Sequence, residues 1–150
     1  MRNSMNIEIR ECNIEDARYI YELNRDEMEY DYPFEQTIDK LERILSSKND
    51  KVFVAIIQDI VVGYVHANDY DVIYTPHMKN IMGIAVSSKY KGNGIGKALL
   101  TEVENWAKET GAYGIRLVSG EERSGAHEFY RHCGYIENKR QINFKKIVKN

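Results

Sequence analysis

The sequence is poor in cysteine and its charges are nearly balanced. Its two cysteines, Cys12 and Cys133, lie far apart, and neither belongs to a C-x-x-C motif or a cysteine–histidine cluster. They are most simply free thiols in a reducing compartment, which predicts a cytoplasmic protein that holds no metal. The formal net charge is −2 at pH 7. This balance gives no general attraction to nucleic acid or to an anionic membrane.

Long apolar runs are also missing. No stretch approaches the length of a membrane span, and residues 1–5 lack the apolar core of a signal peptide. We therefore expect neither a membrane partner nor a secretion leader. With 150 residues, of which 43% are hydrophobic, the chain can bury a substantial core. It contains no repeats, linkers or low-complexity tracts, so we expect one domain over residues 1–150.

The most informative segment is a glycine-rich stretch between an apolar run (81–86) and an amphipathic helical pattern. Its glycines, Gly92, Gly94 and Gly96, occupy alternate positions. This spacing lets successive backbone N–H groups point into one hollow, and the start of the helix adds further unpaired N–H groups and a positive dipole end. A strand, a glycine turn and a helix start together form a seat for a pyrophosphate. We therefore expect a phosphorylated cofactor.

Two well-known glycine loops do not fit this segment. A P-loop that ends at Gly96 and Lys97 requires glycine and then serine or threonine where the chain has Lys91 and Ala98. A dinucleotide fingerprint that starts at Gly92 requires glycine at Lys97. A turn that merely connects strand and helix is the plain alternative. It is disfavoured because an ordinary turn does not need the entropic penalty of three glycines.

Two segments resemble one known family. The stretch from Lys91 to Gly96 resembles the [QR]-x-x-G-x-[GA] acetyl-CoA loop of the GNAT superfamily of N-acetyltransferases. The stretch from Ala126 to Tyr135 reads A-x-x-F-Y-x-x-x-G-Y and is similar to the last motif of that superfamily. The two segments occur in the expected order and cover roughly residues 80–136. The resemblance implies acetyl-CoA as co-substrate and an amine as acceptor.

The hydrophobic patterning predicts a mixed order of strands and helices. We expect strands over 7–11, 52–57, 60–67, 81–86 and 115–118, and helices over 13–28, 35–46, 95–110 and 125–132. The tail, 136–148, should add one or two final strands. This order matches the fold that the resemblance implies, an α/β protein with a twisted, mostly antiparallel mixed sheet and helices on both faces.

The resemblance also implies how the cofactor is held. The backbone of Ile84, Ala85 and Val86 would bind the pantetheine arm, and one of their N–H groups would polarise the thioester carbonyl. The pyrophosphate would lie on the loop, whose binding residues would be Lys91, Gly92, Asn93, Gly94, Ile95, Gly96 and Lys97.

Two positions depart from the family pattern. Lys91 stands where glutamine or arginine is usual, and lysine neutralises phosphate without forming a planar bidentate fork. Arg123 stands where asparagine is frequent. Arg123 either reaches a cofactor phosphate or is a solvated surface charge.

Tyr130 is the predicted catalytic residue. In the family, the tyrosine of the F-Y pair lies near the cofactor sulfur and donates a proton to the departing thiolate. A phenol, with a pKa of about 10, suits a neutral donor in a dry cleft. The plain alternative is a core aromatic on a helix.

The general base and the acceptor are open at this stage. Candidates for the base are Glu27, Glu29, Asp31, His66 and Asp69, or an ordered water. Acids and aromatics interleave in the segments that set specificity in this fold, at Tyr30, Tyr32, Phe34, Asp69, Tyr70, Asp71 and Tyr74. They would suit a cationic acceptor. The same residues could instead pack a lid or a dimer interface.

We therefore predict an acetyl-CoA-dependent N-acetyltransferase that acts on a primary amine of a small molecule or peptide by direct attack in a ternary complex. The alternative is a non-catalytic acetyl-CoA or CoA sensor of the same fold, because the strand 81–86 contains no acid. Dimers are common in the family, so a homodimer is one assembly that the resemblance implies.

Overall fold

The computed structural model describes residues 6–149, so the prediction that 1–5 are not a leader lies outside the described residues. A single five-stranded sheet organises the fold, in the order β1-β2-β3-β4-β5. The strands are β1 (Glu8–Glu11), β2 (Asp50–Ile57), β3 (Ile60–Tyr70), β4 (Met78–Val86) and β5 (Gly114–Arg116). The first four pair antiparallel and β5 runs parallel to β4. This is the mixed, mostly antiparallel sheet that the sequence predicts.

The hairpin of β2 and β3 turns where the sequence indicates, at Gln58 and Asp59. Both residues have positive φ angles, 49° and 65°. A two-residue turn with two positive φ values matches the right-handed twist of the flanking strands. The turn sets the register of the first pairs of β2 and β3, and an irregularity between Ala55 and Ile56 shifts the register by one residue farther along the hairpin.

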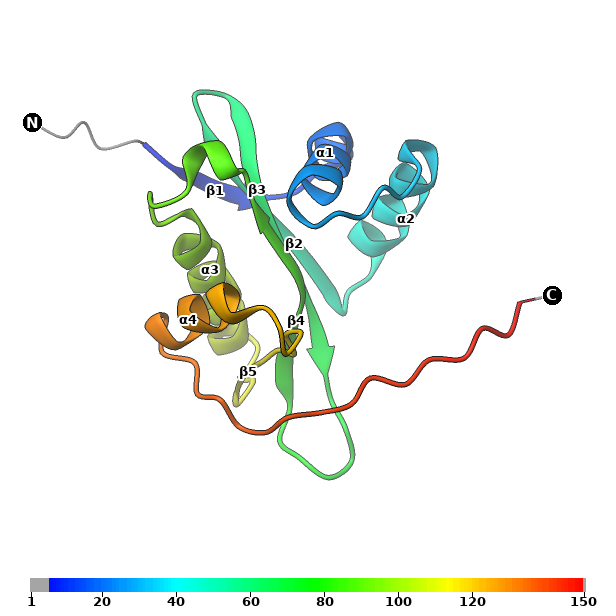
Figure 1. The fold of residues 1–150 in the computed structure, drawn as a ribbon, viewed down its shortest axis with the longest axis vertical. Helices are drawn as coiled ribbons and strands as arrows, with labels where there is room; N and C mark the ends of the chain where they lie inside the picture. The colour runs from blue at the N-terminus through cyan, green and yellow to red at the C-terminus, as the bar shows by residue number, and fades with distance from the viewer. Residues whose placement is uncertain (1–5, 150) are drawn as a thin grey trace, which may run out of the picture. The chain divides into compact units, whose positions relative to one another are not determined.

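Helices cover both faces of the sheet (Figure 1). The helices α1 (Ala17–Glu27) and α2 (Phe34–Ser46) lie on one face, and α3 (Ile95–Glu109) lies on the other. The amphipathic spacing of α1 buries Ile20 and Leu23 against the sheet, and α2 adds Leu41 to the same core.

The helix α3 approaches the sheet at Gly63. A Cβ atom at this position would lie 3.0 Å from the carbonyl oxygen of Ala85 and 3.3 Å from Cγ2 of Ile95. Leu99 and Val103 have no exposed surface. Because glycine leaves room here, the start of α3 is held close to the end of β4.

The sequence analysis misplaces the end of β3 and the start of β4. We expected one strand to end at 67 and the next to begin at 81, but β3 continues to Tyr70 and β4 already begins at Met78. The register joins Tyr70 to Met78, and Met78 also pairs with Gly114. These long-range partners hold polar residues in strands that local patterning does not predict.

The chain forms two compact units. The first ends at Leu117 and the second begins at Val118. The second contains α4 (Ser124–His132), as the sequence predicts, followed by a tail without strands. The prediction of one or two strands over 136–148 is therefore wrong. All residues of this range are exposed, and alternating apolar residues form a strand only when another strand accepts their hydrogen bonds. No helix in the described part of the chain is both long and apolar enough to cross a bilayer.

Candidate functional site

The strand β4 loses a neighbour halfway along its length. It pairs with β3 up to Val86, but β5 pairs only with Met78, Lys79 and Asn80. Within the described chain, 81–86 therefore has no strand partner on the β5 side. Exposed strand edges present N–H and C=O groups that take up an extended ligand. This open edge contains the predicted residues Ile84, Ala85 and Val86.

An irregularity in β4 marks the start of this open edge. His66 pairs with Gly83, whereas the next residue of β3, Ala67, pairs with Ile81. Met82 is therefore the extra residue of a β-bulge. Bulges bend a strand and redirect its backbone groups, and they occur often beside functional sites.

Hydrogen bonds within the first unit fix the beginning of the loop after β4. The N–H of Ser87 donates to the carbonyl of Val62 at 2.8 Å, and the N–H of Ser88 donates to Oε2 of Glu27 at 3.0 Å. Farther along, Nδ2 of Asn93 donates to the carbonyl of Tyr90 at 2.8 Å. The end of α1 and the side chain of Asn93 thus give the loop a defined path.

The rest of the loop presents a row of unused donors. Gly92 and Gly94 have φ angles of 83° and 76°, which favour glycine. Gly94 is the N-cap of α3 and offers no side-chain cap; the first helical bond runs from the N–H of Ala98 to its carbonyl at 3.0 Å. Among the described residues, no acceptor meets the N–H groups from Gly92 to Lys97. Such a row at a helix start can bind a phosphate.

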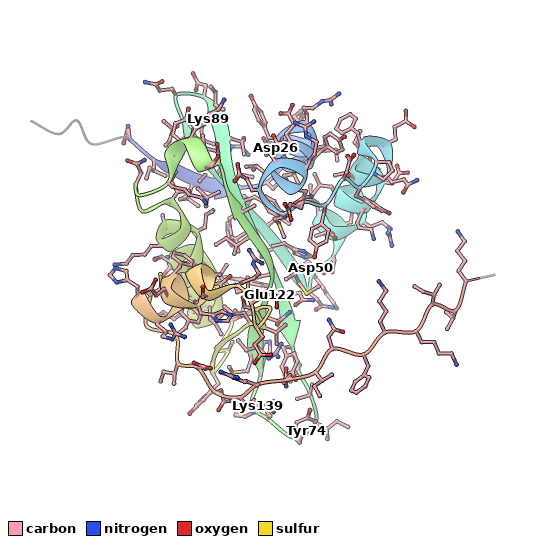
Figure 2. The ribbon with its side chains drawn as sticks, in the orientation of Figure 1. Asp26, Asp50, Tyr74, Lys89, Glu122 and Lys139 are labelled. Carbon is pink, nitrogen blue, oxygen red and sulfur yellow. The ribbon has the colours of Figure 1, made fainter. Side chains whose placement is uncertain are left out.

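Lysines supply positive charge around these donors. Lys89, Lys91 and Lys97 are all exposed. Figure 2 shows Lys89 and Asp26 toward the same end of the sheet. The hydrogen bond from Arg25 and, more weakly, the charge of Lys89 lower the pKa of Asp26. Lys91 and Lys97 have no ion-pair partner among residues 6–149, so their charge is available to an anion.

A second group of polar residues lies on the α1 side of the same strands. The hydroxyl of Tyr64 donates to Oδ1 of Asn24, and burial raises the pKa of Tyr64 to about 12. A Cβ atom at Gly83 would lie 3.9 Å from this hydroxyl. Two residues farther along β3, Nε2 of His66 lies 2.7 Å from Oδ1 of Asp50 on β2. The sheet face beside the open edge therefore holds a neutral phenol and a histidine–carboxylate pair.

Besides His66, three of the candidate bases already have hydrogen-bond partners. Asp69 contacts Nε2 of His77 at 2.7 Å and Nζ of Lys79 at 2.5 Å. Burial alone would raise the pKa of Asp69, but these two hydrogen bonds outweigh it and hold the pKa below its usual value. Glu27 accepts from the backbone of the loop, and Asp31 accepts from the hydroxyl of Tyr21 at 3.1 Å.

The predicted acceptor surface is reduced in the same way. The guanidinium of Arg18 lies 4.0 Å from the ring centre of Phe34, and that of Arg116 lies 4.2 Å from the ring centre of Tyr70. Both aromatic rings are thus occupied by internal cations. Residues of the predicted surface that are exposed are Tyr30, Tyr32, Asp71 and Tyr74.

The second unit holds Tyr130 and Arg123. Tyr130 is half-buried on α4, and its ring centre lies 5.3 Å from that of Phe129. Burial raises the pKa of Tyr130, and the charge of Arg123 opposes this rise. Arg123 is the exposed N-cap of α4. The phenol therefore stays protonated at neutral pH.

The sequence reasoning did not single out Asp50, the partner of His66. The two-residue turn alone would place Val52 opposite Val65. Only the register shift between Ala55 and Ile56 brings His66 opposite Val52, so no local signal marks Asp50. Lys79 was also missed. It is almost fully buried, with Nζ 3.7 Å from the ring centre of Trp106, and nothing local in the sequence indicates a buried lysine.

Two curated relatives match parts of the chain. An uncharacterized N-acetyltransferase of Methanocaldococcus jannaschii is 30% identical over 108 residues, which are 71% of this chain and 48% of that protein. An aminoglycoside N(6')-acetyltransferase type 1 of Stenotrophomonas maltophilia is 33% identical over 63 residues, which are 42% of this chain and 41% of that protein. The matches thus span less than half the length of either relative.

Solved structures share the fold over nearly the whole chain. The aminoglycoside N-acetyltransferase AAC(6')-Iy in complex with CoA has a TM-score of 0.87 at 18% identity and covers 99% of both chains. A transcriptional regulator of Bacillus halodurans C-125 has a TM-score of 0.84 at 22% identity, over 94% of this chain and 100% of that one. At these identities the likeness establishes the fold, and it confirms the predicted architecture.

The model of one family matches most of the sequence. This family is described as the acetyltransferase (GNAT) family, and the match extends over residues 17–135. It includes the open edge of β4, the glycine loop and α4. As the two sequence motifs predicted, the chain belongs to the acetyltransferase (GNAT) family.

Proposed function

We propose that the chain is an acetyl-CoA-dependent N-acetyltransferase, with residues 1–150 acting as one domain. One observation carries the proposal: the open edge of β4 leads directly into the loop whose N–H groups, from Gly92 to Lys97, have no acceptor in the described chain. The strand edge offers hydrogen bonds to an arm with amide groups, and the loop offers donors to a pyrophosphate. CoA combines these two features in one molecule.

The proposed cofactor contacts follow from this arrangement. The backbone of Ile84, Ala85 and Val86 binds the pantetheine arm, and the loop binds the pyrophosphate. The exposed charge of Lys91 supports the phosphate contacts, as does that of Arg123 in the second unit. Lysine acts here as a point charge, since it lacks the bidentate geometry of arginine.

The proposed reaction is a direct acyl transfer. The lone pair of an amine nitrogen attacks the thioester carbonyl carbon, a C–N bond forms, and the C–S bond breaks. An N–H group of the β4 edge stabilises the charge that develops on the carbonyl oxygen. Tyr130 donates its phenolic proton to the leaving sulfur, and burial, which raises its pKa, keeps that proton on the phenol until then.

We propose a cationic small-molecule amine as acceptor, with a peptide amine as the alternative. Support comes from the exposed side chains of Tyr30, Asp71 and Tyr74, which can bind cations through ring faces and charge. The ring of Tyr32 is exposed too, but Nζ of Lys40 already lies 5.3 Å from its centre. The aminoglycoside N(6')-acetyltransferase of Stenotrophomonas maltophilia among the relatives supports the same class.

A second candidate function is a CoA-binding sensor without turnover. It is favoured by the absence of an acid in β4 and by the transcriptional regulator among the solved structures with this fold. For either function we propose a cytoplasmic protein that exists as a homodimer and has no nucleic-acid or membrane partner. Cys12 and Cys133 lie far apart in the sequence and belong to no disulfide or metal-binding pattern, which supports a reducing compartment.

Calorimetric titration with acetyl-CoA, with CoA and ATP as parallel ligands, tests the proposal. We expect micromolar binding of acetyl-CoA and CoA and none of ATP. Binding should be lost in Gly94→Glu, which places a side chain and a negative charge at the helix start. Release of CoA on addition of amines then separates the enzyme from the sensor. Failure of acetyl-CoA and CoA to bind would overturn both functions.

A further inference from the structure

We propose that His66 is the general base of the reaction and that Asp50 positions it. This inference rests on the proposed acetyl transfer and names the residue that takes the proton from the attacking amine. The family motifs contain neither residue. The geometry of the described sheet brings them together beside the open edge of β4.

The position of His66 relative to the open edge is the first argument. His66 on β3 faces Gly83 on β4, and adjacent strands lie about 4.8 Å apart. Gly83 belongs to the stretch of β4 that β5 leaves unpaired, and it has no side chain to cover the imidazole. The ring therefore lies one strand away from the backbone that would hold the thioester. Nε2 is turned toward Asp50 on β2, the neighbour of β3 opposite β4, so the attacking nitrogen would enter over Gly83 and reach Nδ1, directly or through one water.

The hydrogen bonding of the ring is the second argument. Nε2 of His66 lies 2.7 Å from Oδ1 of Asp50, and Nδ1 has no partner among the described residues. A carboxylate accepts the Nε2 proton, which assigns the tautomer and leaves the lone pair on Nδ1. The side chains of His66 and Asp50 are 17% and 19% exposed. The pair is therefore sheltered from bulk water and still reachable.

Among the described residues that pair with His66 or flank it on the sheet, no other group offers a base. On the same strand the nearby titratable group is Tyr64, whose pKa burial raises to about 12. From β2 the facing group is Asp50, and Gly83 of β4 brings none. From β5, Arg116 is held by Oδ1 of Asn80 at 2.6 Å, and the α1 residues beside Gly83 and Tyr64 are Met28 and Asn24.

The pair of His66 and Asp50 accounts for the proton that the attacking amine loses. As the C–N bond forms, Nδ1 accepts a proton from the amine nitrogen, and the imidazolium is stabilised by the carboxylate of Asp50. Tyr130 supplies a separate proton to the leaving sulfur, and the resulting phenolate takes a proton back from solvent. A hollow of about 310 Å³ is lined by Asp50, together with Lys51 and Leu45, and opens this side of the pair to water. The imidazolium afterwards returns a proton to solvent (Asp50 is labelled in Figure 2).

The test compares the full chain with His66→Gln and Asp50→Asn, using neamine, spermidine and glycinamide as acceptors. We expect His66→Gln to lower kcat/KM on the order of 100-fold or more, with the affinity for acetyl-CoA unchanged. The fall in rate toward acid pH, which is the acid limb of the pH profile, should disappear when the imidazole is removed. Asp50→Asn should lower kcat and shift that acid limb, and Asp50→Glu should restore much of both. Added imidazole should rescue His66→Gly, which a structural role for His66 would not allow.

A matched control is available on the same sheet. His77 also contacts a carboxylate, that of Asp69, but it lies in the segment before β4, away from the open edge. His77→Gln should leave kcat/KM and the acid limb unchanged.

The possible results distinguish a failure of the role of His66 from a failure of the proposed function. Full turnover with an unchanged acid limb in His66→Gln overturns the role of His66 and leaves the proposed function standing. No release of CoA from the unaltered chain with any of the acceptors overturns both. If His66→Gln fails to fold by circular dichroism, the rescue of His66→Gly by imidazole decides, and its absence counts against the base.

Discussion

Single backbone positions decide whether the loop after β4 can present its N–H groups. Gly92 and Gly94 have φ angles of 83° and 76°, in the left-handed region. A Cβ atom at either position would meet nothing within 4 Å, so space does not require glycine there. The backbone conformation does, because it costs an L-residue about 1–2 kcal/mol. The glycines are therefore needed for the shape of the donor row.

Gly94→Ala is expected to weaken acetyl-CoA binding and to lower the free energy of unfolding by about 1–2 kcal/mol. Gly111→Ala is the control, because Gly111 has a φ of 74° and equally open surroundings at the other end of α3. Its stability loss should be similar, while its affinity for acetyl-CoA stays unchanged. Urea unfolding and calorimetry measure the two effects. Equal loss of affinity in both variants would contradict a specific role for the loop.

Tyr130→Phe is expected to lower kcat by about 100-fold or more while the affinity for acetyl-CoA stays unchanged. Because burial raises the pKa of this phenol, the unaltered chain should keep its rate to a higher pH than an ordinary tyrosine would allow. Tyr113→Phe is the control, since Tyr113 is 80% exposed. Turnover of Tyr130→Phe equal to that of the control from neutral to alkaline pH would rule out the acid role.

At the scale of elements, the entry of α1 depends on a buried carboxylate. A short turn, Ile14–Asp16, precedes α1, and Asn13 and Asp16 form a capping box across it. Asp16 accepts two hydrogen bonds from Arg10, at 2.8 and 3.0 Å, and one from the N–H of Asn13 at 2.9 Å. These bonds join β1 to α1. Because the end of α1 holds Ser88, they also support the start of the cofactor loop.

Asp16→Asn is expected to lower the free energy of unfolding at pH 7 by about 1–3 kcal/mol. Burial alone would raise the pKa of Asp16, but the bonds from Arg10 and Asn13 outweigh it, so the folded pKa lies below the ordinary value of about 3.9. Because the pKa of Asp16 is lower in the folded state, the ionised carboxylate stabilises the protein fully above the ordinary pKa. This stabilisation is lost as the pH falls through the folded pKa. The difference between the unaltered chain and the variant should therefore shrink below about pH 4.

Urea unfolding at neutral and acid pH measures this prediction. Asp26→Asn is the control, because its ion pair with Arg25 is fully exposed and should contribute no measurable stability. A difference for Asp16→Asn that persists unchanged at acid pH would contradict the electrostatic origin.

At the scale of the whole molecule, the tail after α4 carries apolar side chains that the described chain leaves in solvent. They are Ile136, Ile142, Phe144, Ile147 and Val148, each at least 72% exposed. Apolar surface of this kind is unusual for a soluble monomer and indicates a contact with another surface. Their partial alternation suits a strand, which a second copy of the chain could accommodate. This supports the proposed homodimer.

Phe144→Asp is expected to convert the dimer to a monomer, since a charge at this position opposes burial between two copies. Ile73→Asp is the control, because Ile73 is fully exposed in the segment between β3 and β4. Light scattering after size exclusion measures the mass, and calorimetry confirms that acetyl-CoA still binds. A monomer for the unaltered chain, or a dimer for Phe144→Asp, would contradict the role of the tail.

The sequence determined the features that depend on local backbone chemistry. The glycines at 92 and 94 specified left-handed conformations, Gln58 and Asp59 marked a hairpin turn, and helical periodicity gave the four helices within a few residues. The glycine spacing and the F-Y motif also specified the family, which the match over residues 17–135 confirms. Neighbouring residues alone specify these features, so they can be predicted without knowing which distant residues are in contact.

Only the tertiary structure decided which polar residues meet. It joined His66 to Asp50, paired Asp69 with Lys79, and gave Glu27 a structural role at Ser88, although the sequence treated Glu27, His66 and Asp69 as equal candidates. It also ended β5 at Arg116, which opens β4, and left the tail without the strands that its pattern predicted. Register, bulges and pairing depend on residues far apart in the chain, and local patterning carries no information about them.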